Sequence, residues 1–198
     1  MNRSVSQGQL FSGQSIQSGF NQISDLPLSR NLLHTWQQRL HDHQAPLFQG
    51  EALNGKQDSL FGVAEDASID HLKPLKLTPL PLSFWRWPIS PHQGPAVYLV
   101  MDRPQHLAHP LLLYVGETGA ADRRWKGAHD CKIYLAAYRE ALGRVELASQ
   151  LSIRFWTDVP MAIKARRKLE RDLIQRWLPP FNKETRGRWT TPFTAELN

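Results

Sequence analysis

Residue types that can act on a phosphate group recur through the second half of the chain. Tyr98 and Tyr114 lie in two short apolar segments, Arg124 belongs to a basic run, and Glu170 lies in a long segment rich in lysine and arginine. An arginine guanidinium offers a planar fork of donors to a phosphate oxygen. A glutamate is a hard oxygen ligand suited to Mg²⁺. Glu170 also falls close to an apolar stripe, where a carboxylate costs desolvation unless it has a partner or a metal.

Three short strands and several helices must position these residues. Apolar, β-branched or alternating segments predict strands over 96–100, 111–115 and 151–156, the first two forming an antiparallel hairpin with a long loop. Asp122 and Asp130 are expected to cap two helices, and Pro160 to begin a third that ends before Pro179. The order β-β-α-α-β-α predicts a small α+β domain with three antiparallel strands flanked by helices.

The chain before this domain divides into two parts. Residues 1–24 are rich in Ser, Gln, Gly and Asn and are expected to be disordered. Residues 25–93 form an accessory region, with a helix capped by Ser29 that runs to about His41 and an extended proline-rich segment over 74–95. In that segment Phe84, Trp85 and Trp87 could stack on bases or, as we expect, pack on the domain that spans 94–198.

Charge is distributed unevenly along the chain. The net charge is +6, and residues 123–188 hold 16 Lys and Arg against 7 Asp and Glu, a balance of +9, whereas the remainder carries −3. A basic half on a near-neutral chain suggests a polyanionic partner, because Lys and Arg bind phosphates and release counterions. An ordinary solvated basic surface remains the alternative.

Composition also bears on the compartment. No apolar run approaches the roughly 18 residues that a membrane helix needs. Cys131 is the single cysteine, so an intramolecular disulfide is not possible. The N-terminal residues lack the apolar core of a secretory signal. We therefore expect a soluble cytoplasmic protein without a membrane partner.

The ordered set of motifs resembles the GIY-YIG nuclease family. Ala96-Val97-Tyr98 stands where the family has Gly-Ile-Tyr, and Tyr114-Val115-Gly116 where it has Tyr-Ile-Gly. Arg124 corresponds to the family's catalytic arginine, although its neighbour Arg123 could take that position. Glu170 matches the metal-binding glutamate, and Asn182 the asparagine that closes the set. The resemblance covers about residues 94–185.

The resemblance implies a metal-dependent endonuclease that hydrolyses DNA phosphodiester bonds with Mg²⁺, or Mn²⁺, as cofactor. Glu170 would hold the metal, Arg124 would bind the phosphate, and Tyr114 would position water or phosphate. Tyr98 would be the general base, and with an ordinary pKa near about 10 it would need nearby cations to favour its phenolate. His129 stands near the sequence position where related nucleases carry a histidine. It could assist proton transfer, or it could be a half-buried structural residue.

DNA is the expected partner, with RNA or branched nucleic acid as alternative substrates. The sequence leaves open whether cleavage is sequence-specific or structure-specific, and which oligomeric state the protein adopts. The expected contacts with the nucleic-acid backbone are basic residues of the helical segments and the tail: Arg123, Lys126, Lys132, Arg166, Arg167 and Lys183. Glu117, after the second strand, is expected to be a solvent-facing loop acid. The alternatives are a non-catalytic nucleic-acid-binding module on the same scaffold and a protein-interaction domain.

Overall fold

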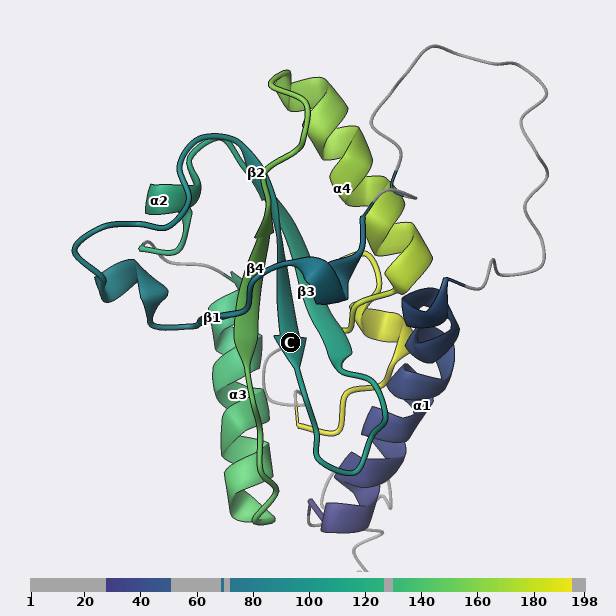
Figure 1. Ribbon diagram of the computed structural model, residues 1–198. Helices are drawn as coiled ribbons and strands as arrows, with labels where there is room; N and C mark the ends of the chain where they lie inside the picture. Colours follow the sequence, from purple (N-terminus) through teal and green to yellow (C-terminus); the bar gives the residue numbers. More distant parts are fainter. Residues whose placement is uncertain (1–27, 51–68, 70–71, 127–129, 194–198) are drawn as a thin grey trace, which may run out of the picture.

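The computed structural model describes residues 28–50, 69, 72–126 and 130–193, and its centre is a four-stranded antiparallel sheet (Figure 1). The strands are β1 (Leu80–Pro81), β2 (Ala96–Asp102), β3 (Leu111–Thr118) and β4 (Ser152–Trp156), in the order β1-β4-β2-β3. The helices are α1 (Arg30–Gln49), α2 (Ala121–Arg124), α3 (Asp130–Arg144) and α4 (Ile163–Trp177). Short 3₁₀ turns span Pro74–Lys76, Phe84–Arg86 and Arg186–Arg188.

The α+β class is confirmed, but the expectation of three strands is wrong. The fourth strand, β1, comes from the proline-rich segment, where Leu80 pairs with Ile153 and Pro81 with Ser152. Because proline cannot donate to a ladder, it is tolerated at the outer edge of a sheet, which is where Pro81 lies. A strand of two residues shows no alternation of polar and apolar side chains, so the sequence pattern missed it.

The hairpin of β2 and β3 is confirmed and runs further than expected. Tyr98 faces Gly116 across the two strands, and Val97 faces Glu117. Glu117 therefore belongs to a strand rather than to a loop. The register shifts after Val100, so that one residue of β3, Leu113, has no direct partner in β2.

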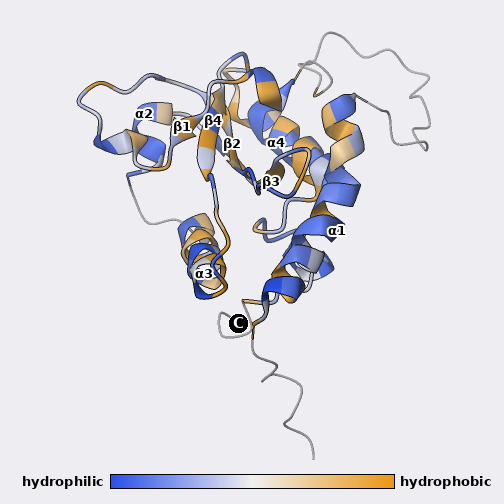
Figure 2. Ribbon diagram, turned by 60° about the horizontal axis from the view of Figure 1, so that its bottom comes forward, coloured by the Kyte–Doolittle hydropathy of each residue, from blue (hydrophilic) through white to orange (hydrophobic). Residues whose placement is uncertain are grey.

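Successive strand residues point to opposite faces of the sheet, and each face has its own core. Tyr98 and Val100 pack on the face covered by α3, while Val97 and Leu99 pack on the face covered by α4. The helices carry apolar stripes beside hydrophilic ones (Figure 2). In the part of the chain that the structure describes, no helix combines the length and apolar character needed to cross a membrane.

Helix α1 contributes to both cores. The hydroxyl of Ser29 accepts a hydrogen bond from the amide of Leu32 at 3.1 Å, which confirms the expected cap. The helix continues past His41 to Gln49 and ends at Gly50, which adopts the left-handed conformation. Because α1 and β1 belong to the same cores and sheet as the rest, the described residues of the accessory region form one body with the domain after residue 94. Residues 1–24, expected to be disordered, lie outside the described residues.

The other helix starts differ in detail from expectation. Asp122 does not cap α2, since Ala120 occupies the cap position and Asp122 lies in the first turn. Helix α4 begins at Ile163, three residues after Pro160, and ends directly before Leu178, where the backbone turns left-handed ahead of Pro179.

Side chains cover the outer edge of β3. Gln44 of α1 accepts from the amide of Leu112 at 2.8 Å and donates to its carbonyl at 3.0 Å. Asn182 pairs in the same way with Val115 further along the strand. An open edge strand presents unpaired donors and acceptors to other chains, so these amides substitute for a fifth strand.

Candidate active site

Two tyrosines and an arginine form a hydrogen-bonded group at one end of the hairpin. Tyr98 of β2 and Tyr114 of β3 stack with ring centres 6.0 Å apart. The Tyr98 hydroxyl is hydrogen-bonded to the Arg124 guanidinium and to Tyr114. Because arginine can only donate, the oxygen of Tyr98 accepts from Arg124 and its proton is left for Tyr114. The structure thus brings together three of the expected site residues.

Gly116 makes this arrangement possible. A Cβ atom at Gly116 would lie 2.4 Å from both Cζ and the hydroxyl oxygen of Tyr98, and 2.9 Å from a ring carbon of Tyr114. Any other residue would overlap the Tyr98 ring, so the glycine of the Tyr-Val-Gly triplet is required by the tyrosine that lies across it.

Burial keeps both phenols neutral. Tyr98 is 0% exposed, and desolvation raises its pKa far above the ordinary value near 10, an effect that Arg124 only partly opposes. Burial also raises the pKa of Tyr114, to about 12. A fully buried phenol held protonated is poorly suited to take a proton from water, so the expectation that Tyr98 is the general base is at odds with its environment. Tyr114, which is half-buried, is the hydroxyl closer to solvent.

The choice between the two adjacent arginines is decided by their partners. Arg124 contacts Tyr98, whereas the side chain of Arg123 is 78% exposed and lies 3.7 Å from Asp122. Trp125, the next residue, packs edge-on against the Tyr98 ring with centres 5.9 Å apart and fixes the short helix α2 over the hairpin. Arg124 is therefore the arginine of the site.

Glu170 reaches the site from α4. Its Oε1 accepts the backbone N–H of Glu117 at 3.1 Å, and its charge contributes, behind burial, to the raised pKa of Tyr114. Burial raises the pKa of Glu170 itself; the N–H of Glu117 opposes this rise, while the carboxylates of Glu117 and Glu184 add to it. Glu170 thus lies at the end of β3 beside a second carboxylate.

Glu117 and Arg166 form an ion pair that sequence reasoning missed. The Glu117 side chain is 16% exposed, and its Oε2 accepts from Arg166 Nε at 2.8 Å. Arg166, only 2% exposed, also donates to the carbonyls of Pro160 and Met161. Arg166 was expected on the nucleic-acid-binding surface, and its burial contradicts that expectation, since its Nε is bonded to Glu117 and its Nη1 to two carbonyls. Glu117 was expected to face solvent, which is also wrong.

Asn182 is committed to the backbone of β3. Its Oδ1 accepts from the Val115 amide at 2.9 Å and its Nδ2 donates to the Val115 carbonyl at 2.8 Å. The side chain is buried, and both of its ends are used. Asn182 therefore positions the strand that carries Tyr114 and Gly116.

The remaining expected contacts fall into three groups. Lys126, Arg167 and Lys183 are exposed, as a surface role requires. Lys132 is partly buried and donates to the carbonyl of Trp125 at 2.6 Å. His129 lies outside the described residues.

The fit of a magnesium ion rests on Glu170. Among the described residues no group of three or more His, Cys, Asp and Glu could hold a metal, and the second oxygen of Glu170 has no hydrogen-bond partner there. Glu117 cannot assist, since its oxygens face Arg166 and Arg167. One available carboxylate oxygen fits Mg²⁺, which commonly keeps several waters and takes one or two carboxylates plus substrate phosphate.

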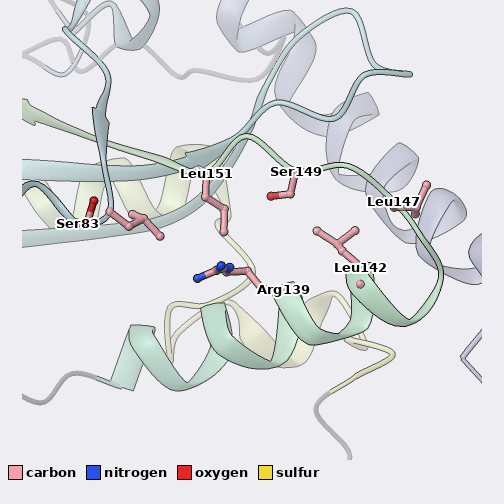
Figure 3. A pocket seen from close by; sticks show the side chains of 8 residues that line it. Ser83, Arg139, Leu142, Leu147, Ser149 and Leu151 are labelled. Carbon is pink, nitrogen blue, oxygen red and sulfur yellow. The ribbon is translucent and has the colours of Figure 1, made fainter.

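A separate groove lies lower on the α3 side, with a volume of about 550 Å³ (Figure 3). Leu82, Leu142, Leu147 and Leu151 provide its apolar walls, and the Arg139 side chain extends toward Leu151. The candidate site residues are not among those that line it, so it is distinct from the site.

Comparisons with known proteins give no match: no family model, curated protein or solved structure matches the chain. Tyr98, Tyr114 and Arg124 come from β2, β3 and α2 and form one hydrogen-bonded group, while Glu170 of α4 is bonded to the end of β3 at Glu117.

Proposed function

We propose that the chain is a metal-dependent endonuclease of the GIY-YIG type that hydrolyses phosphodiester bonds in DNA. The observation that supports this most directly is the contact of Tyr98 with Arg124 and Tyr114, with Glu170 near enough for its charge to act on Tyr114. Tyr98, Tyr114 and Arg124 come into contact from three different elements although no local pattern requires it, and Glu170 lies at the end of β3, the strand of Tyr114. A solvated arginine and two ordinary strand tyrosines would not need this arrangement.

Each residue has a role that its surroundings allow. Arg124 binds a non-bridging phosphate oxygen and stabilises the charge that grows there as water attacks. Tyr98 donates to Tyr114 and fixes its hydroxyl, and Tyr114 orients the attacking water by accepting a hydrogen bond from it. As the new P–O bond forms and the old one breaks, the proton of this water passes to solvent, and the leaving oxygen takes a proton from solvent. Glu170 would hold the Mg²⁺, which supplies a positive charge for the phosphate and lowers the pKa of its bound water.

Exposed cations near this centre suit a polyanionic substrate. Lys126 and Arg123 flank Arg124, and Arg167 lies on α4 beside Glu117. Such residues bind phosphates and set the register of the substrate without reading its sequence. Arg166 is left out of this surface because of its burial.

Cleavage of supercoiled plasmid tests the proposal. Purified protein is incubated with plasmid and Mg²⁺, Mn²⁺ or EDTA, and Arg124→Ala is compared with the adjacent control Arg123→Ala. We expect metal-dependent nicking that falls by roughly 10²- to 10³-fold in Arg124→Ala, as for loss of one donor to a transition-state oxyanion. Arg123→Ala should lose far less, and only through weaker substrate binding that excess plasmid restores. Equal loss in both variants would contradict the assigned site.

One observation favours the second candidate, a non-catalytic nucleic-acid-binding module. Glu170 and Asn182 both hydrogen-bond the backbone of β3, which is a structural task. Under this alternative the protein binds DNA with steep salt dependence, because phosphate contacts release counterions, but leaves every nucleic-acid substrate uncut. The plasmid experiment combined with a salt titration of DNA binding separates the two.

A further inference from the structure

The segment Phe84–Trp87 divides its three aromatic residues between the core and the surface. Phe84 is buried and packs edge-on against Phe155, with ring centres 5.3 Å apart. Trp85 is half-buried, and Trp87 is 44% exposed. The expectation that this segment packs on the domain therefore holds for Phe84 and Trp85, whereas Trp87 stays at the surface. Trp87 is thus the indole of this segment that is open to a ligand, and an indole offers a large aromatic face.

Two cations lie against the indole of Trp85. The guanidinium of Arg86 is 5.0 Å from the centre of the Trp85 ring, and Lys132 Nζ is 6.0 Å from the same ring. Lys132 is also 5.5 Å from the ring of Trp125. We call Trp85, Arg86 and Trp87 the aromatic shelf.

The shelf is fixed next to the candidate active site. Trp125, which shares Lys132 with Trp85, packs directly on Tyr98. The carbonyl of Gly94, which follows the shelf, accepts the amide of Ala121 at 2.8 Å at the start of α2. Figure 1 shows α2 and the 3₁₀ turn over Phe84–Arg86 on the same side of the sheet. A strand whose phosphate contacts Arg124 would pass close to the shelf.

We propose that the aromatic shelf stacks an unpaired base of the substrate, so that the preferred substrate is nucleic acid with a single-stranded stretch beside the phosphate that Arg124 holds. Bases of a duplex are already stacked on one another and cannot lie on an indole, whereas bases of a single strand can. Arginine and lysine beside the rings add cation–π attraction and neutralise the backbone. This inference rests on the proposed function for the position of the phosphate, but the binding itself is independent of cleavage.

Binding in EDTA tests the shelf without any cleavage. Fluorescence anisotropy measures the affinity of wild type, Trp87→Ala and Trp87→Phe for a labelled oligonucleotide. The oligonucleotide is presented as a single strand, as a blunt duplex and as a duplex with a single-stranded flap. Leu32→Ala, which removes an exposed apolar side chain of α1, is the matched control. Thermal unfolding of each variant checks that the fold is retained.

We expect wild type to bind the single strand and the flap more tightly than the duplex. Trp87→Ala should weaken the affinity for the single strand and for the flap at least about fivefold, which is the lower end of the range for loss of one stacked base. Trp87→Phe should restore part of this affinity, and the affinity for the duplex should not change. Equal affinity of wild type and Trp87→Ala for the single strand overturns the shelf, even where the plasmid is cut. A shelf-dependent preference without cleavage of any substrate supports the shelf and rejects the nuclease. If Trp87→Ala instead weakened binding of a protein partner and left binding of the oligonucleotides unchanged, the inference would also be overturned.

Discussion

Replacing Gly116 with alanine should damage both the fold and the site, because the new methyl group has no space. Its Cβ would lie 2.4 Å from two atoms of Tyr98, whereas carbon atoms in contact are about 3.5–4.0 Å apart. The Tyr98 ring would have to move by about 1 Å or more. Trp125, Phe155 and Tyr114 surround that ring with centres 5.9–6.0 Å away, so it cannot swing aside.

The expected cost follows from overpacking. Extra methyl groups in a well-packed core cost about 1–3 kcal/mol. The smaller chain entropy of alanine in the unfolded state returns about 0.4–1 kcal/mol. We therefore expect Gly116→Ala to lower the free energy of unfolding by roughly 1–2.5 kcal/mol, and to disturb the hydrogen bonds of Tyr98 with Arg124 and Tyr114.

Urea denaturation followed by circular dichroism measures this cost in two backgrounds. In Tyr98→Leu, whose shorter side chain lacks the clashing atoms, Gly116→Ala should cost little. Gly143→Ala is the control, since nothing lies within 4 Å of its added methyl group and alanine favours the helix by about 0.8–1 kcal/mol. An equal cost of Gly116→Ala in both backgrounds would refute the explanation by contact with Tyr98.

Three further predictions follow from the surroundings of the site. Asn182→Ala should destabilise the fold by about 1–3 kcal/mol for each buried strand group it leaves unpaired, measured by urea denaturation; unchanged stability with lost cleavage would make Asn182 catalytic instead. Arg166→Ala should destabilise by up to about 3–5 kcal/mol because Glu117, only 16% exposed, keeps just the longer contact with the exposed Arg167, whereas Arg167→Ala should weaken DNA binding with little change in stability; the reverse pattern would contradict the assignment. Burial lowers the pKa of His43, so the unfolded chain takes up a proton at this histidine more readily than the folded one, and stability should fall as pH drops below about 6.5. Between pH 8 and pH 5 the melting temperature of His43→Gln should therefore fall less than that of wild type. Equal slopes of melting temperature against pH in the two proteins would contradict this.

Local patterns in the sequence predicted much of the fold. The β-branched run around Tyr98 and the apolar run before Gly116 gave the hairpin, and Ser29 gave the start of α1. These features depend on residues within one element or on neighbours in the chain. The ordered motifs named four site residues, and the structure brings three of them, Tyr98, Tyr114 and Arg124, into one hydrogen-bonded group.

The errors concern contacts between distant elements. Strand β1 exists because β4 offers an edge, and nothing within Leu80–Pro81 indicates that partner. The burial of Tyr98, which argues against a general base, depends on α2 and α3 covering the sheet. Neither is encoded in a pattern of a few residues.

A signal for the buried ion pair was nevertheless present. Arg166 lies three and seven positions before Leu169 and Leu173, so it falls on the apolar stripe of α4 rather than on its basic face. A buried arginine needs an anionic partner, and Glu117 at the end of a buried strand was available. Helical position, more than residue type, separates Arg166 from the exposed Arg167.

The proposed metal-dependent cleavage is tested most directly by one pair of conservative variants in the plasmid assay. Glu170→Gln removes the charge but keeps an oxygen that can accept the Glu117 amide, and Glu140→Gln makes the same change on the exposed face of α3. The proposed function predicts that Glu170→Gln folds normally and loses Mg²⁺-dependent cleavage, while Glu140→Gln cleaves like wild type. Cleavage at the wild-type rate by Glu170→Gln would contradict it, and would assign the carboxylate to holding β3 alone.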